Sequence, residues 1–218
     1  MNILFLWLVK ITGWPLQLFY YRKKVYTLNN DKSLRKIKGS ALIISNHTSV
    51  FDYPLMMFTF LGRTIRTLVA EVMYKKHKLL NKVLVRVGAI KVDRGVYDFS
   101  FMNKMIDCLN KGQVGLIYPE SRVPREDERD HFLEFKPSYV YVALESGAPI
   151  IPIYTNGIYG RLKKKYKSHA KVVIGQKIYA NELYNNDLSE KENITYINNY
   201  VKGKIEELKN YLEEYEKR

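Results

Sequence analysis

The chain has 218 residues, enough for one sizeable hydrophobic core and too few for two independent ones. Hydrophobic residues make up 46% of it, which excludes general disorder, and the single Cys108 excludes an internal disulfide framework and Cys-based zinc sites. The formal charge of +14 indicates an anionic partner, such as an anionic membrane surface, a phosphorylated substrate or nucleic acid.

The N-terminal residues 1–21 are mostly apolar and aromatic, and the basic residues 22–24 follow them. A transmembrane helix needs about 20 predominantly apolar residues, and Lys10 and Pro15 interrupt this run. A secretory signal would carry its basic residues before the apolar region. Two tryptophans and the basic end are typical of an interfacial anchor. We therefore predict a helical membrane-interface segment over residues 1–38, with packing on the protein's own core and a single membrane span as alternatives.

Strand-like and helix-like stretches alternate through the rest of the chain, as read from the spacing of their apolar residues. The predicted strands are residues 41–44, 66–70, 89–93, 114–118, 149–154 and 171–178. The predicted helices are residues 51–60, 78–87, 97–110, 139–145 and a tail that starts with the capping-box pair Ser189 and Glu192. No repeat or low-complexity linker divides this part. We predict a single α/β domain over residues 39–218, with a mixed central sheet flanked by helices.

The first predicted strand runs into the segment Asn46-His47-Thr48-Ser49-Val50-Phe51-Asp52. A histidine at a strand end, oriented by a carboxylate in the next turn, is a common means of deprotonating a hydroxyl near neutral pH. Taken alone, the same spacing also fits a loop histidine and an N-cap aspartate, because Asp52 lies two residues before Pro54. Sites in open α/β sheets gather beyond the carboxyl ends of the strands, so the ends of the other strands decide between these readings.

Three further strand ends carry recognisable segments: Gly88-Ala-Ile-Lys-Val-Asp-Arg94, Tyr118-Pro-Glu-Ser-Arg122 and Ala148-Pro-Ile-Ile-Pro-Ile153. With the first segment they resemble, in order and spacing, the four sequence blocks of the glycerolipid acyltransferase family, which includes the 1-acyl-glycerol-3-phosphate acyltransferases. The family blocks read roughly Asn-His-x4-Asp, Gly-x-x-x-(Ile/Val)-Asp-Arg, Phe-Pro-Glu-Gly-Thr-Arg and Val-Pro-(Ile/Val)-(Ile/Val)-Pro-Val. The resemblance spans about residues 43–154, half of the chain.

The third block departs from the family pattern. Between its Glu and its Arg the family has Gly-Thr, whereas this chain has only Ser121. Arg122 is therefore displaced by one residue, and Arg125 is a possible substitute for it. The Phe-Lys-x-Gly pattern that follows is altered to Phe-Lys-Pro-Ser at residues 135–138. Both departures affect the expected specificity for the acceptor more than the expected reaction.

The resemblance implies transfer of a fatty acyl group from a thioester to the free hydroxyl of 1-acyl-glycerol 3-phosphate (lysophosphatidic acid), giving phosphatidic acid. Another lysophospholipid or glycerol 3-phosphate is the alternative acceptor. The resemblance implies that His47 is the general base and that Asp52 orients its imidazole and stabilises the cationic form. Arg94 and Arg122 would bind the phosphate of the acceptor through their planar donor forks.

A substrate-binding role is implied for three more residues of the blocks. Asn46 would polarise the thioester oxygen, Glu120 would position the acceptor or hold one of the arginines, and Ser121 lies between the two. No cofactor or metal is expected, and the acyl donor is acyl-CoA or acyl carrier protein.

The basic residues favour an anionic phospholipid membrane as partner and do not require nucleic acid. We expect the lysine-rich segment 163–167 and the N-terminal segment to dock the protein on the cytoplasmic face of the cell membrane, as a peripheral or monotopic protein. The non-enzymatic alternative is a basic module that binds anionic lipid or nucleic acid, in which His47 and Asp52 are structural. Such a module would tolerate His47→Ala, whereas an acyltransferase would lose turnover.

Overall fold

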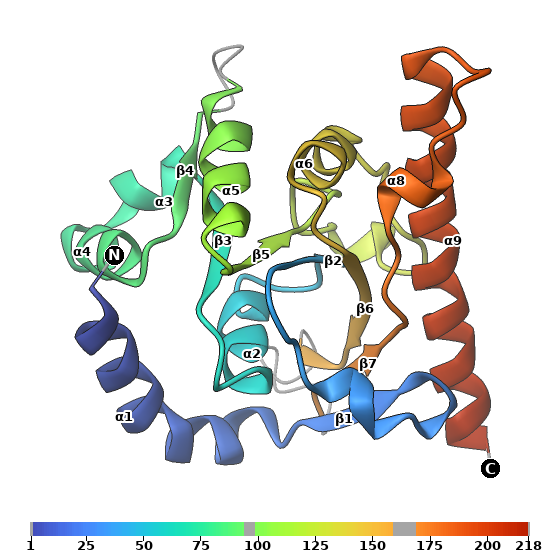
Figure 1. Cartoon of the computed structure of the whole chain (residues 1–218). Helices are drawn as coiled ribbons and strands as arrows, with labels where there is room; N and C mark the ends of the chain where they lie inside the picture. The colour runs from blue at the N-terminus through green and yellow to red at the C-terminus, as the bar shows by residue number, and fades with distance from the viewer. Residues whose placement is uncertain (1, 94–98, 159–168, 218) are drawn as a thin grey trace.

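The computed structural model describes residues 2–93, 99–158 and 169–217 and arranges them around a seven-stranded sheet (Figure 1). The strand order is β1-β7-β6-β2-β5-β3-β4, and every neighbouring pair is parallel except the antiparallel pair β6–β7. The strands are β1 Lys24–Thr27, β2 Ala41–Ser45, β3 Ile65–Ala70, β4 Ile90–Val92, β5 Val114–Ile117, β6 Ile150–Asn156 and β7 Lys171–Ile174. The carboxyl ends of β2, β3, β4, β5 and β6 therefore meet at one edge of the sheet.

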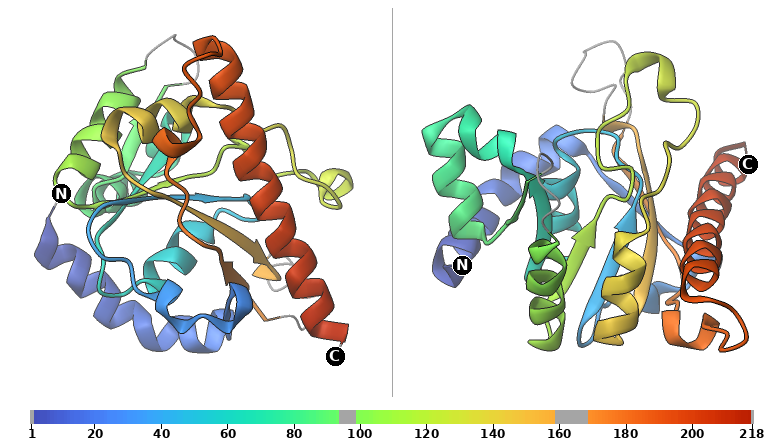
Figure 2. Two further views of the ribbon diagram at one scale, coloured as in Figure 1. Left: turned by 45° about the vertical axis from the view of Figure 1, so that its right-hand side comes forward. Right: turned by 90° about the horizontal axis from the view of Figure 1, so that it is seen from above.

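Helices cover both faces of the sheet, and each face has its own hydrophobic cluster. One cluster draws on α5, α6 and α9, and the other on α1 and α2. Seen from above, α3 and α4 lie at the opposite side of the molecule from α9 (Figure 2). The helices are α1 Ile3–Tyr21, α2 Asp52–Thr59, α3 Glu71–Lys76, α4 Lys78–Val87, α5 Ser100–Asn110, α6 Ser138–Ser146, α8 Ala180–Leu183 and α9 Glu190–Lys217, with short 3-10 helices at Leu28–Asn30, Lys32–Arg35 and Glu126–Glu128.

Local sequence signals account for several element ends. The capping box of α9 is confirmed, because the Ser189 N–H donates to Glu192 Oε2 over 2.8 Å and the Glu192 N–H donates to Ser189 Oγ over 3.3 Å. α4 ends at Val87, and its C-cap residue Gly88 has a φ of 80°, in the left-handed region that favours glycine. Gly115 lets α5 approach the sheet, since a Cβ there would meet Met105 Sδ at 2.7 Å.

The predicted α/β class and the mixed sheet flanked by helices are confirmed. The helices α3 and α8, the three short 3-10 helices and the strand β1 were not predicted; β1 pairs with β7 from within residues 1–38. β7 ends at Ile174 rather than at residue 178, and Ile178 forms only an isolated bridge with Ile150. The division of the chain at residue 38 stays a prediction.

Helix α1 has an unusual distribution of side chains, with polar groups facing the protein. Lys10 is buried, and its Nζ donates to the carbonyl oxygens of Leu61 and Arg63, both over 2.7 Å. Burial lowers the pKa of Lys10 to about 8. Gln17 is also buried, whereas Leu4 is 82% and Phe19 80% exposed. No described helix combines the length and the hydrophobicity that a membrane crossing requires.

Candidate active site

A cavity of about 550 Å³ opens at the carboxyl edge of the sheet, beyond the central strand β2. The long loop after β5, which projects beyond the sheet in the view from above (Figure 2), forms one wall, and α9 contributes another. The lining includes Asn46, His47 and Thr48 after β2, Glu120 and Arg129 after β5, Thr155 and Asn156 of β6, and Lys209 and Glu213 of α9. The strand-end segments 46–52 and 118–122 are thus brought together, as the parallel strands predict.

His47 and Asp52 form the central contact of this site. His47 Nδ1 lies 2.8 Å from Asp52 Oδ2, and the side chains are 18% and 0% exposed, respectively. Because Nδ1 faces the carboxylate, Nε2 is the ring nitrogen that remains to accept a proton. His47 lines the cavity, and the buried carboxyl group of Asp52 lies behind its ring. A general base requires such an arrangement.

The carboxylate of Asp52 holds the loop before α2 rather than the first turn of that helix. It accepts the backbone N–H groups of Thr48 over 2.6 Å and Ser49 over 2.9 Å, and Oδ1 accepts the Thr48 hydroxyl over 2.9 Å. The N-cap residue of α2 is Phe51, which makes no side-chain cap bond. Asp52 therefore fixes the backbone around His47 as well as its ring.

Tyr118 stacks on the imidazole of His47, with ring centroids 4.3 Å apart and planes inclined by 13°. Its hydroxyl is buried without a hydrogen-bond partner among the described residues, and desolvation raises its pKa well above the ordinary value. The stack fixes the plane of the imidazole and places a π face against the position where imidazolium charge would form. The sequence marks Tyr118 only as the last residue of a predicted strand and the first of the third block, so this contact was not predicted.

Glu120 ties the loop after β5 to the backbone of His47. Its Oε1 accepts the His47 N–H over 2.8 Å and its Oε2 accepts the Leu133 N–H over 3.1 Å. The side chain is buried, and desolvation raises its pKa against the opposing effect of these two hydrogen bonds. Glu120 thus lies in the site, as its place in the third block predicts. Its carboxylate accepts hydrogen bonds from backbone N–H groups rather than from an arginine.

Asn46 joins β2 to β6. Its Nδ2 donates to the Thr155 carbonyl oxygen over 2.9 Å, and its Oδ1 accepts the Thr155 N–H over 2.7 Å. This reciprocal pair fixes the strand end from which His47 projects.

Arg122, one of the two arginines predicted to bind phosphate, does not line the cavity. Arg122 forms a two-pronged ion pair with Glu128, with N–O distances of 2.6 Å for both contacts, and neither Arg122 nor Ser121 is among the lining residues. Ser121 has a φ of 61°, a conformation that favours glycine, the residue that the family block has after its Glu. Arg94 and the lysine-rich segment 163–167 lie outside the described residues.

Arg129 is the arginine that the fold brings to the cavity. Its Nη1 donates to the Thr48 carbonyl oxygen over 3.0 Å and its Nη2 to the Pro124 carbonyl oxygen over 3.0 Å. It lies outside the four blocks, and no spacing in the sequence points to it. Arg125, the substitute considered from the sequence, is not among the lining residues.

Comparison with known proteins gives a consistent result. A family model described as Acyltransferase matches residues 23–156. A 1-acyl-sn-glycerol-3-phosphate acyltransferase of Limnanthes douglasii is 28% identical over 131 residues, which cover 56% of this chain and 45% of that protein. The chain thus spans less than half the length of this relative. The crystal structure of the 1-acyl-sn-glycerophosphate (LPA) acyltransferase PlsC from Thermotoga maritima is similar in fold, with a TM-score of 0.67, 20% identity, and coverage of 94% of this chain and 79% of that one.

Proposed function

The chain belongs to the acyltransferase family, and we propose that it moves a fatty acyl group from an acyl thioester to the free hydroxyl of lysophosphatidic acid, giving phosphatidic acid. The observation that carries this proposal is the His47 Nδ1–Asp52 Oδ2 contact of 2.8 Å at the edge of an open cavity. The names of the relative from Limnanthes douglasii and of the Thermotoga maritima structure support lysophosphatidic acid as the acceptor.

In the proposed mechanism His47 Nε2 removes the proton of the acceptor hydroxyl while the oxygen attacks the thioester carbonyl carbon. The C–O bond forms, the C–S bond breaks, and the imidazolium returns its proton to the departing thiolate. Asp52 keeps the imidazole in one orientation and stabilises its charged form, as the carboxylate of a catalytic triad does. No acyl-enzyme intermediate is required, because the thioester is already activated.

Cations that line the cavity offer donors to a phosphorylated acceptor, beside four carboxylates that also line it, those of Glu120, Glu126, Asp130 and Glu213. Arg129 and Lys209 both lie on the cavity, from the loop after β5 and from α9. An anionic head group near them would leave the acyl-bearing glycerol within reach of His47. Another lysophospholipid or glycerol 3-phosphate is the alternative acceptor.

Thiol release from acyl-CoA tests this function when it is measured with each acceptor in turn. We expect release that depends on lysophosphatidic acid and yields phosphatidic acid. Acyl carrier protein thioesters replace acyl-CoA if no release occurs. The absence of acceptor-dependent release with both donors would contradict the proposal.

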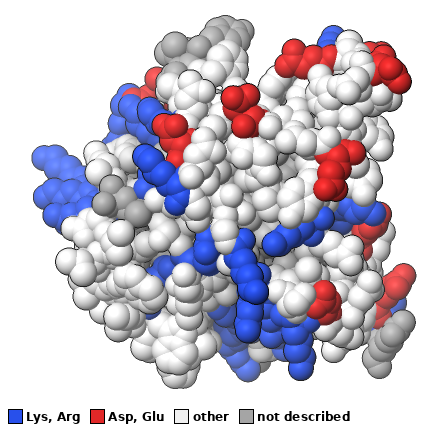
Figure 3. All heavy atoms as spheres, viewed as in Figure 1, with Lys and Arg blue, Asp and Glu red and all other residues white. Residues whose placement is uncertain are grey.

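The outer side of α1 is proposed to lie in the headgroup region of an anionic membrane. Apolar residues occupy that side, while Lys10 and Gln17 are buried on the inner side together with Leu6 and Tyr21. The helix thus packs on the core with one side and leaves an apolar side uncovered. A group of exposed cations follows α1 in the chain, and Lys and Arg side chains gather on the lower part of the face seen in Figure 3. The cations are Arg22, Lys24, Lys32, Arg35, Lys36 and Lys38.

Replacing three exposed residues of α1 (Leu4→Ser, Leu8→Ser and Ile11→Ser together) should lower binding to vesicles of anionic phospholipid by about 1,000-fold or more. Each apolar side chain that no longer enters the lipid removes about 1.5–3 kcal/mol of binding free energy, and 1.4 kcal/mol corresponds to about tenfold in affinity. Vesicle sedimentation measures the partition. The matched control replaces two exposed residues near the start of α9 and in the loop before it, Leu188→Ser and Tyr196→Ser, and should bind as the wild type does. Equal binding by all three proteins would exclude α1 as the docking surface.

A further inference from the structure

Tyr118 reaches the ring of His47 from the neighbouring strand of the sheet. Ile44 of β2 pairs with Ile117 of β5, so Tyr118 leaves β5 beside the point where the chain leaves β2 toward His47. The two rings lie face to face, with centroids 4.3 Å apart and planes inclined by 13°. Asp52 contacts Nδ1 at the edge of the imidazole, and Tyr118 covers one of its two faces.

The phenol of Tyr118 does not transfer the proton itself near neutral pH. Desolvation raises its pKa well above the ordinary value, and the negative charge of Asp52 and the neighbouring Tyr53 and Tyr21 add to this effect. The side chain therefore stays neutral over the working range of the enzyme. Tyr118 is also not among the residues that line the cavity, so its effect on the reaction passes through His47.

A stacked aromatic ring acts differently on the two protonation states of an imidazole. The face of the ring carries negative charge and attracts a cation that lies within about 6 Å of its centroid. The stack places the imidazolium form of His47 inside this range. Positive charge develops on His47 as the acceptor hydroxyl loses its proton, so the contact favours the transition state over the ground state.

The hydroxyl of Tyr118 is a separate matter from its ring. The family block has Phe where this chain has Tyr118, so the aromatic face is common to both and the hydroxyl is not. The hydroxyl oxygen is buried without a hydrogen-bond partner among the described residues. A buried hydroxyl without a partner costs free energy. The ring and the hydroxyl can therefore be tested independently.

We propose that Tyr118 is a positioning residue for acyl transfer, whose ring face stabilises the imidazolium form of His47 and holds Nε2 toward the cavity, and whose hydroxyl contributes to neither. The proposal rests on the proposed function, in which His47 takes the proton of the acceptor. Within that function, the stack with Tyr118 sets how strongly His47 holds the proton during the reaction.

The other charged and titratable groups around His47 are the same in wild type and in the variants described below. Asp52 contacts the ring, and Glu120 accepts the His47 N–H. The further groups that line the cavity are Glu126, Arg129, Asp130 and His131 of the loop after β5, Tyr154 of β6, Lys171 of β7, and Lys209 and Glu213 of α9. A difference in pH dependence between the variants therefore reports on the stacked ring.

The dependence of kcat/KM on pH, measured for Tyr118→Leu and Tyr118→Phe, tests the proposal. Leucine keeps an apolar side chain against the imidazole and removes the aromatic face. The acidic limb of its profile should move to lower pH by about one unit, and its kcat should fall about tenfold. Tyr118→Phe should keep the wild-type profile and resist urea at least as well, because it removes only the unpartnered hydroxyl. Tyr118→Met replaces Tyr118→Leu if that variant does not fold.

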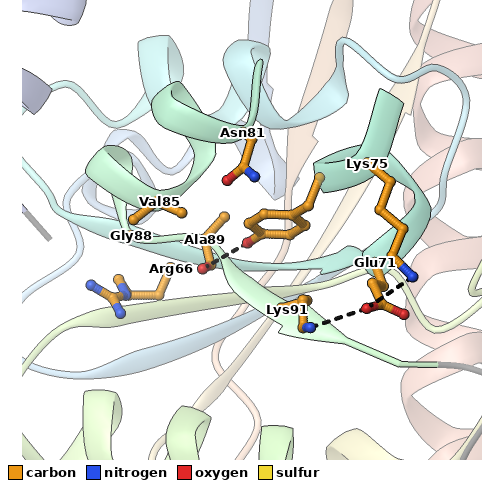
Figure 4. A pocket seen from close by; sticks show the side chains of 9 residues that line it. Arg66, Glu71, Lys75, Asn81, Val85, Gly88, Ala89 and Lys91 are labelled. Atoms are coloured by element: carbon orange, nitrogen blue, oxygen red, sulfur yellow. Dashed lines mark hydrogen bonds and ion pairs between the residues drawn. The ribbon is translucent and has the colours of Figure 1, made fainter. Parts of the chain in front are cut away.

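Tyr74 provides the matched control. It lines a second cavity, of about 510 Å³, at the β3–β4 edge of the sheet (Figure 4), and this cavity shares no lining residue with the one at His47. Its hydroxyl donates to the Ala89 carbonyl oxygen over 2.9 Å. Tyr74→Leu should leave the acidic limb in place, and Tyr74→Phe should lower the resistance to urea, since it loses a hydrogen bond that is made.

NMR titration of the His47 ring in the full chain gives a second readout that needs no turnover. The ring should lose its proton at lower pH in Tyr118→Leu than in wild type and in Tyr118→Phe. The same acidic limb and the same NMR midpoint in Tyr118→Leu and wild type would overturn the proposal, as would a Tyr118→Phe profile that follows Tyr118→Leu. If the NMR midpoint moves but no protein transfers an acyl group, the proposed function fails while the effect of the stack stands.

Discussion

Asp52→Asn should lower kcat for acyl transfer by about 10³- to 10⁴-fold, the size of loss that follows the same change in a serine-protease triad. The carboxylate accepts four hydrogen bonds, from His47 Nδ1, the Thr48 and Ser49 N–H groups and the Thr48 hydroxyl. An amide offers one acceptor oxygen and turns an NH₂ group toward groups that donate. The imidazole then loses both its fixed orientation and the negative charge that stabilises its protonated form.

The measurement is the steady-state rate with saturating donor and acceptor, together with urea unfolding of the same preparation. Asp107→Asn is the matched control, because Asp107 is exposed in the last turn of α5, which leads to the amino end of β5, whereas the site lies at the carboxyl ends of the strands. It should keep the wild-type rate. A rate for Asp52→Asn within threefold of wild type, in a folded protein, would show that Asp52 has only a structural role.

Glu120→Gln should reduce both the free energy of unfolding, by about 1–3 kcal/mol, and kcat, by about 10- to 100-fold. Each oxygen of Glu120 accepts one backbone N–H, from His47 and from Leu133. Glutamine can accept only one of them, and its NH₂ group opposes the other. The loop after β5 then no longer holds the His47 backbone in one place.

Chemical denaturation measures the first effect and the initial rate of thiol release the second. Glu134→Gln serves as control, since Glu134 belongs to the same loop but is exposed and forms its ion pair with the exposed Lys136. If Glu120→Gln matched this control in both measurements, Glu120 would not connect the loop to the catalytic histidine.

Much of the fold follows from local patterns. The buried run at residues 41–44 predicts β2, and the spacing in residues 78–87 predicts α4 with the bounds that the structure has. β1 was not predicted, because four residues with the sequence Lys-Val-Tyr-Thr carry little pattern of their own. It is a strand because β7, nearly 150 residues later, supplies its hydrogen-bond partners.

Local sequence patterns also predict only part of the site. His47 and Asp52 are five positions apart, so one turn of chain brings them together, and the sequence predicts their contact. Tyr118 and Arg129 reach the His47 loop only because β2 and β5 are neighbours and the loop after β5 folds back over them. The ion pair of Arg122 depends on the 3-10 turn that presents Glu128, which the block pattern does not describe.

The most direct test of the central claim compares wild type with His47→Ala in acceptor-dependent thiol release from acyl-CoA. His77→Asn is the control, because His77 is exposed, its Nδ1 accepts the Leu79 N–H at the start of α4, and asparagine can make the same cap. With His47 as general base, the variant should lose about 10²- to 10⁴-fold in rate, while His77→Asn and binding to anionic vesicles stay unchanged. Equal rates for wild type and His47→Ala would contradict the mechanism.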